Sequence, residues 1–180
     1  MASWAKDVLD FWFRDLTPKQ WYTKDDAVDR TIVEQFGALH ETIAATDNAE
    51  LAASRETALA AIIVLDQFAR NMFRGSPKSF AGDAKARALA NATIAAGHEA
   101  AMTDDERQFL YMPFMHSETL ADQDRSVELF TKLGRENNLK YAKLHRDPIL
   151  AFGQFPHRNA ILGRPTSPAE QAWIDEHGGF

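Results

Sequence analysis

The stretch that decides the fold is DDAVDRTIVEQFGALHETIAA, residues 25–45. Its large apolar side chains follow one another at intervals of four, four, three and four residues: Val28, Ile32, Phe36, Leu39 and Ile43. Because an α-helix repeats every 3.6 residues, this spacing places all of them on one face. We therefore predict an amphipathic helix here, with its apolar stripe against a core.

The same helical period recurs along the chain, and no segment alternates convincingly with the period of two that marks a β-strand. Capping boxes begin at Thr17, Thr103 and Ser167, where a Gln or Glu follows three residues later, and Ser3 is a further candidate N-cap. The expected helices cover residues 4–16, 25–45, 54–73, 83–96, a fifth from 103 that Pro113 kinks or breaks, 122–134, 139–152 and 167–178.

These elements predict an all-α fold in one domain, residues 1–180. Short turns make neighbouring helices antiparallel, and alanine-rich segments let backbones approach closely. We expect about eight helices in antiparallel hairpins that stack in the manner of a solenoid. A compact helical bundle is the alternative.

Composition excludes several classes of function. The sequence has no cysteine, which removes zinc-thiolate sites and cysteine nucleophiles and is compatible with a cytoplasmic protein. The net charge of −6 does not favour nucleic acid or an anionic membrane as a partner. The longest apolar run, residues 58–65, is far shorter than a membrane span, and no signal peptide is recognisable at the N-terminus.

One segment differs in charge from the rest of the chain. Residues 139–164 carry five basic side chains against one acidic, a local charge of +4 with histidine neutral. The same segment contains His145 and His157. An anionic ligand is therefore the partner that this part of the chain favours.

Four stretches together resemble an uncharacterised bacterial family, domain of unknown function nine hundred and twenty-four. They are VLDFWF (8–13), LDQFARNMFRG (65–75), YMPFMHSE (111–118) and FPHRNAILGR (155–164). The resemblance extends to further short matches: Asp122-Gln123, Ser126-Val127, and Tyr141-Ala142 with His145. It implies a fold similar to tetratricopeptide (TPR) repeats over nearly the whole chain, with the helical hairpins in a right-handed superhelical stack, and it assigns no biochemical role.

In the second stretch, Arg70 and Arg74 lie one helical turn apart and share a face, with Asn71 beside them. Two guanidinium groups so placed are suited to grip a carboxylate or phosphate. The favoured interpretation is structural, because Asp66 precedes Arg70 by the four residues of a helical ion pair.

The third stretch places His116, Ser117 and Glu118 in succession. A serine beside a histidine suggests a nucleophile and its base, and His116 with Glu118 suggests a metal site. Adjacent and i,i+2 side chains on a helix do not face each other, however, so a hydrogen-bonded helix end is favoured over both. His116 and Glu118 remain candidate ligand-binding residues.

The fourth stretch groups His157, Arg158 and Asn159, which offer imidazole, guanidinium and amide donors together. They could hold an anionic oxygen, or they could donate to the carbonyls of neighbouring helix ends. We further expect these three residues to lie near Arg70 and Asn71 in space. A surplus of positive charge there would favour a bound anion.

The tryptophans and neighbouring aromatic residues are more readily explained by core packing than by a ligand box: Phe11, Trp4, Trp12 and Trp21. No catalytic residue, metal ligand or cofactor is identified. The sequence thus predicts a binding or interaction module with an anion-accepting site, whose partner is a small anionic ligand or a peptide segment. The alternative is an enzyme acting on a phosphate- or carboxylate-bearing small molecule.

Overall fold

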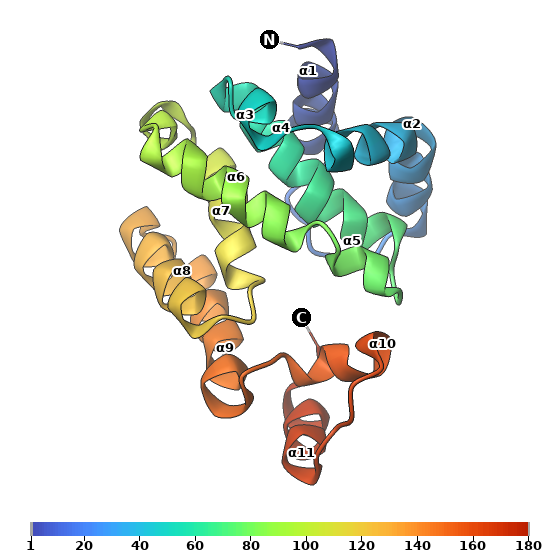
Figure 1. Ribbon diagram of the computed structural model, residues 1–180, viewed down its shortest axis with the longest axis vertical. Helices are drawn as coiled ribbons and strands as arrows, with labels where there is room; N and C mark the ends of the chain where they lie inside the picture. Colours follow the sequence, from blue (N-terminus) through green and yellow to red (C-terminus); the bar gives the residue numbers. More distant parts are fainter. Residues whose placement is uncertain (1, 180) are drawn as a thin grey trace. The chain divides into compact units, whose positions relative to one another are not determined.

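The computed structural model describes residues 2–179, and these residues form helices and turns with no β-strand (Figure 1). The all-α class predicted from the sequence is confirmed. The α-helices are α1 (Ser3–Asp10), α2 (Asp26–Ala45), α3 (Asn48–Leu51), α4 (Arg55–Ile62), α5 (Ala69–Met72), α6 (Asp83–Ala95), α7 (Asp104–Met115), α8 (Leu120–Leu133), α9 (Glu136–Phe152), α10 (Asn159–Leu162) and α11 (Pro168–His177).

Five shorter helical elements connect or interrupt these α-helices. Two are π-helices, η1 (Phe11–Asp15) and η2 (Ile63–Phe68). Three are 3₁₀ turns, η3 (Pro77–Phe80), η4 (His98–Ala101) and η5 (Pro156–Arg158).

The chain divides into two compact units. The N-terminal unit comprises residues 2–74 and 78–113, and the C-terminal unit comprises residues 75–77 and 114–179. The boundary in α7 follows Pro113, although the helix itself continues through this proline to Met115. A single domain over the whole chain, and the TPR-like superhelical arrangement, stay predictions.

Most helix starts agree with the sequence signals. The Asp25 side chain accepts hydrogen bonds from the backbone N–H groups of Ala27 and Val28, so α2 begins where predicted. On its stripe, Val28, Ile32, Phe36 and Ile43 are buried and Leu39 is half-buried. The prediction for Ser3 is wrong, because α1 already includes this residue and Ala2 precedes it without a side-chain cap.

The two π-helices are the main departure from the predicted helices. Residues 4–16 and 54–73 were each expected to form one regular helix, yet each contains a π-helix with an i→i+5 pattern. In the first, Leu16 N donates to Phe11 O at 3.1 Å. The widened segments pack against each other in the N-terminal core. The ring of Phe68 lies 5.9 Å from that of Phe11 and 5.6 Å from that of Trp12.

The aromatic residues near the N-terminus are core residues, as expected. Phe11 and Trp12 are buried, while Trp4 and Trp21 are half-buried. The indole Nε1 of Trp21 donates to the Trp12 carbonyl at 2.7 Å. This packing supports a structural role for the group.

In the C-terminal unit, α8 and α9 form a hairpin joined by a short turn, where Gly134 takes the left-handed conformation with φ of 77°. Each helix buries residues at relative positions 0, 3, 6 and 7. On α8 these are Gln123, Ser126, Leu129 and Phe130, and on α9 they are Ala142, His145, Pro148 and Ile149. Polar side chains thus occupy core positions on both helices.

The capping box at the start of α11 gives a direct stability prediction. Glu170 N donates to Ser167 Oγ at 3.3 Å, and Ser167 N donates to Glu170 Oε2 at 2.8 Å. Ser167→Ala should lower the free energy of unfolding by about 1 kcal/mol, the usual value of an N-cap. Urea denaturation beside the neighbouring variant Thr166→Ala checks this, and equal stability of the two variants would contradict it.

Candidate functional site

Arg70, the centre of the second stretch, is held by two buried carboxylates of the N-terminal unit. Its Nη1 donates to Asp66 Oδ1 at 3.1 Å and to Asp83 Oδ1 at 2.9 Å, and its Nη2 donates to Asp83 Oδ2 at 2.9 Å. The Asp66 side chain is 1% exposed and that of Asp83 is 12% exposed. These contacts support the structural interpretation of Arg70.

Asn71 and Arg74 share a third carboxylate, Asp29 of α2. Asn71 Nδ2 donates to Asp29 Oδ1 at 2.7 Å, and Arg74 Nη2 donates to the same oxygen at 2.9 Å. Sequence reasoning missed Asp29 and Asp83. Asp29 lies more than 40 residues away from its partners along the chain, and no local pattern marks it.

The end of α7 begins the C-terminal group of candidate residues. Ser117 Oγ donates to Asp122 Oδ2 at 2.7 Å and accepts from Thr119 N at 3.2 Å. Gln123 Nε2 donates to the carbonyls of Met115 and Ser117, at 2.7 Å each. This is a hydrogen-bonded helix end, as favoured from the sequence.

Glu118 binds the fourth stretch to this helix end. Its carboxylate accepts two hydrogen bonds from Arg164, at 2.8 and 2.9 Å, and a third from Phe155 N at 2.8 Å. Burial works to raise the pKa of Glu118, but the bonds from Arg164 and Phe155 outweigh it and leave the pKa below its ordinary value. Glu118 is therefore an ionised anchor.

Asn159 has a similar structural partner in Glu170. Its Nδ2 lies 3.2 Å from Glu170 Oε1, which also accepts from Gln154 Nε2 at 2.6 Å. Bonds from Gln154, from the backbone and side chain of Ser167 and from Asn159 lower the pKa of Glu170 to about 2. This carboxylate fixes the turn that carries His157, Arg158 and Asn159.

Arg158 and the imidazoles form a separate group around Phe155. The Arg158 guanidinium lies 4.4 Å from the centre of the Phe155 ring, and its Nη2 donates to the His116 carbonyl at 3.1 Å. The centre of the His157 ring lies 5.5 Å from the centre of the Phe155 ring. His145 of α9 lies 5.9 Å from Phe155 and 6.0 Å from His116.

We call His116, His145, His157 and Arg158 the imidazole–guanidinium cluster. His145 and Arg158 are buried, whereas His116 and His157 are half-buried and reach solvent. Three separate elements supply the cluster: the end of α7, α9 and η5. The sequence indicated His145 only as a member of the basic segment 139–164 and of the family resemblance, and it did not place His145 beside His116.

The pKa of His145 is affected by its burial and by the other members of the cluster. Burial, followed by the charges of His116, Arg158 and His157, lowers the pKa of His145 to about 3. Its ring is therefore neutral at pH 7. Because Nδ1 lies 2.8 Å from the Tyr141 carbonyl, which only accepts, Nδ1 carries the proton and Nε2 the lone pair.

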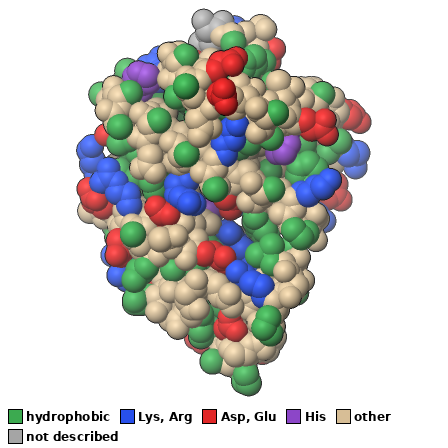
Figure 2. Space-filling view, in the orientation of Figure 1, with side chains coloured by type: hydrophobic (Ala, Val, Ile, Leu, Met, Phe, Trp, Pro, Cys, Tyr) green, Lys and Arg blue, Asp and Glu red, His purple; other side chains and the backbone are tan. Residues whose placement is uncertain are grey.

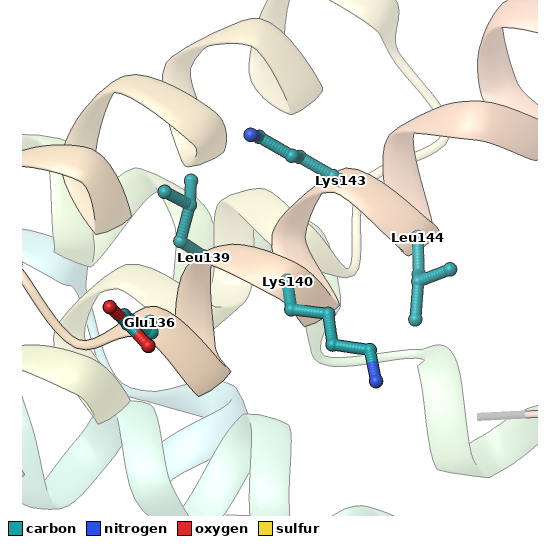
Figure 3. Close-up of a pocket in the computed structure, with 5 residues that line it drawn as sticks. All are labelled: Glu136, Leu139, Lys140, Lys143 and Leu144. Carbon is teal, nitrogen blue, oxygen red and sulfur yellow. The ribbon is translucent and has the colours of Figure 1, made fainter.

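The described C-terminal residues also include a pocket of about 360 Å³ that contains none of the predicted site residues. Its lining comes from α9 alone: Glu136, Leu139, Lys140, Lys143 and Leu144. Figure 3 shows that Lys140 and Lys143 point to different sides of the helix. Their ammonium groups do not converge on one position, so this pocket is a poorer anion site than the cluster.

Residues 2–179 do not contain the features of a metal site or a membrane span. No group of three or more potential ligands is placed to hold a metal ion in this part of the chain. No helix in the same range is long and apolar enough to cross a bilayer. On the face shown in Figure 2, basic and acidic side chains are interspersed.

The predicted site residues therefore divide between the two units. Arg70, Asn71 and Arg74 belong to the N-terminal unit, while His116, Glu118, His157, Arg158 and Asn159 belong to the C-terminal unit. The structure brings the second set together. The predicted proximity of Arg70 and Asn71 to this set stays a prediction.

A family model and one solved structure match the chain and support the family resemblance. No curated protein matches the chain. A solved structure of a protein of unknown function from Agrobacterium tumefaciens is 39% identical, with a TM-score of 0.91, and the match covers 96% of this chain and 97% of that one. Residues 8–178 match the family described as bacterial protein of unknown function (DUF924). The chain belongs to this bacterial family.

Proposed function

We propose that the chain is a bacterial cytoplasmic binding protein whose C-terminal unit accepts an anionic group beside His116, His157 and Arg158. The ligand presents a phosphate or carboxylate, either on a small molecule or on a peptide segment. The observation that carries this proposal is the grouping of His145, His157 and Arg158 around Phe155, with His116 packed against His145.

The half-buried position of the cluster supports binding rather than packing alone. His116 and His157 reach solvent, so a ligand can approach them, while Arg158 is only 6% exposed behind them. A guanidinium held at low exposure interacts strongly with an anion, because little water screens it. Burial is the main cause of the lowered pKa of His145, and the charges of His116, Arg158 and His157 lower it further, in the direction that an anion would oppose.

Glu118 and Glu170 bind the residues around the turn that carries His157 and Arg158. Glu118 accepts from Arg164 and Phe155 N, and Glu170 accepts from Gln154 and Asn159. These two acids organise the surrounding turn. In the N-terminal unit, Arg70, Asn71 and Arg74 bind Asp66, Asp83 and Asp29 in the same manner.

The proposal predicts how phosphate binding depends on Arg158. Arg158→Ala should weaken the binding of inorganic phosphate by roughly 1.5–3 kcal/mol, the value of a hydrogen bond to a charged group. Arg158→Lys should recover only part of this, because lysine lacks the planar fork. Isothermal titration calorimetry measures the dissociation constants.

Arg125→Ala provides the matched control, since Arg125 lies in the same unit and pairs with Glu128 on the surface. It should bind phosphate as the wild type does. The circular dichroism of each variant verifies folding, because Arg158 also donates to the His116 carbonyl. Wild-type protein that does not bind phosphate, or folded Arg158→Ala that binds it equally well, would contradict the proposal.

A further inference from the structure

The segment that follows α11 lies against one member of the imidazole–guanidinium cluster. A Cβ atom placed on Gly179 would lie 3.5 Å from the Cβ of His157 and 3.6 Å from its Cγ and Cδ2. These are the distances of carbon atoms in van der Waals contact. The backbone of Gly179 therefore lies beside the edge of the imidazole that carries Cδ2.

This edge matters for a ligand of His157. The Nδ1 atom of the ring is buried, so Nε2 is the ring nitrogen that a ligand can approach from solvent. Cδ2 is bonded to Nε2. Gly179 thus lies next to the one nitrogen of His157 that is available to an anion.

Gly178 sets the direction in which the segment leaves α11. Its N–H donates to the Ile174 carbonyl at 2.7 Å, which closes the last turn of the helix. Its φ of 72° and ψ of −146° lie in a region that glycine enters readily and that residues with a side chain avoid. The contact with His157 therefore depends on a backbone conformation that glycine provides.

The segment is held weakly beyond this point. Gly178 and Gly179 are both exposed, and Gly179 makes no backbone–backbone hydrogen bond within residues 2–179. Exposed segments with few hydrogen bonds open at a low cost in free energy. Rotation at Gly178 can therefore move Gly179 away from His157 while α11 stays folded.

We propose that residues 178–179 form a movable cover over the anion site. The structure shows the closed form, in which Gly179 occupies space that a phosphate group on Nε2 of His157 needs. The ligand therefore binds the open form more tightly and shifts the population towards it. This inference rests on the proposed function of the cluster.

The cover lowers the affinity of the site by the fraction of molecules that are open. The apparent dissociation constant is the intrinsic constant divided by this fraction. A cover that is closed in about 70–90% of molecules therefore weakens phosphate binding about 3- to 10-fold. Variants that change the closed population should change the affinity by the same factor.

Gly178→Val should bind inorganic phosphate about 3- to 10-fold more tightly than the wild type, because valine disfavours the φ of the closed form. A Cβ on Gly178 would meet no neighbouring atom, so the substitution acts through the backbone alone. Gly97→Val is the matched control, since Gly97 of the N-terminal unit has the same φ and equally open surroundings. It should leave the affinity unchanged in calorimetric titrations of the full chain.

Gly179→Ala should have the opposite effect. Its Cβ adds a van der Waals contact with His157, and alanine narrows the conformations of the open segment. Phosphate should therefore bind about 2- to 4-fold more weakly than to the wild type. Opposite effects of two adjacent substitutions distinguish a cover from a general loss of packing.

Phosphate should also release the segment, which NMR relaxation measures directly. The ¹H–¹⁵N nuclear Overhauser effect of the Gly179 amide should fall when the site is saturated, because the open segment moves faster. That of Gly134, in the turn between α8 and α9, should stay constant.

Each outcome bears on one of the two proposals. Unchanged or weaker phosphate binding by folded Gly178→Val would overturn the cover and leave the anion site intact. Gly179→Ala that binds as tightly as the wild type, or an unchanged relaxation of Gly179 at saturation, would do the same. Failure of phosphate to bind the wild type and every variant would remove the proposed function itself.

Discussion

Arg70→Ala should lower the free energy of unfolding by about 3–5 kcal/mol, the cost of leaving buried charges without their partner. The substitution removes four hydrogen bonds, one to the Asp66 carbonyl and three to the carboxylates of Asp66 and Asp83. Both carboxylates then remain in a poorly hydrated interior. Urea denaturation followed by circular dichroism measures the change.

The same stretch contains a matched control. Arg74 pairs with Asp29, but its side chain is 43% exposed, so Arg74→Ala should cost less than about 1 kcal/mol. Arg70→Lys should fall between the two, because it restores a charge without the planar fork. Similar losses for Arg70→Ala and Arg74→Ala would show that the buried pairing does not stabilise the N-terminal unit.

The second large effect concerns acid stability. The pKa of His145 is lowered to about 3 in the folded chain by burial and by its cationic neighbours, against about 6.5 in the unfolded chain. Between these values the unfolded state binds a proton that the folded state does not. Above pH 6.5 His145 is neutral in both states and does not oppose folding. As the pH falls from 6.5 towards 3, protonation of His145 in the unfolded state lowers the free energy of unfolding by roughly 4 kcal/mol.

His145→Asn isolates this contribution, because an amide can donate to the Tyr141 carbonyl and does not titrate. Its free energy of unfolding should fall less steeply than that of the wild type between pH 6.5 and 3. His177→Asn, at an exposed position, should follow the wild-type slope. Parallel slopes for His145→Asn and the wild type would contradict the neutral, buried state of His145.

The starts of the helices were predicted well from the sequence, because their signals are local. Asp25, Ser54, Thr103 and Ser167 each cap the helix that follows, through hydrogen bonds to residues two or three positions away. Such bonds depend only on neighbouring residues, so a short pattern identifies them. The same locality made the buried stripe of α2 predictable.

The π-helices could not be predicted in this way. An i→i+5 turn accommodates one extra residue and rotates the following side chains, but the apolar residues of 8–13 and 63–68 still fit a regular helical period. The two π-helical segments contact each other through Phe11, Trp12 and Phe68, which lie more than 50 residues apart along the chain. Tertiary contacts of this kind leave no local pattern.

In the candidate site, too, the sequence indicated individual residues but not the contacts between residues that are distant along the chain. Sequence reasoning identified His116, His157 and Arg158 as donors, and one Arg158 bond to a helix-end carbonyl was among its alternatives. It did not identify the contact of His145 with His116 or the pairing of Arg164 with Glu118. These contacts join α9 and the turn after it to residues 116–118, which are far from them along the chain.

The most direct test of the anion site follows each histidine during a phosphate titration. Imidazole resonances of His116 and His157 should shift with a single saturable dissociation constant, and His145 should respond to the changed potential. His40 and His98 of the N-terminal unit serve as internal references and should stay constant. Shifts of equal size at all of these histidines, or none at His116 and His157, would contradict an anion site at the cluster.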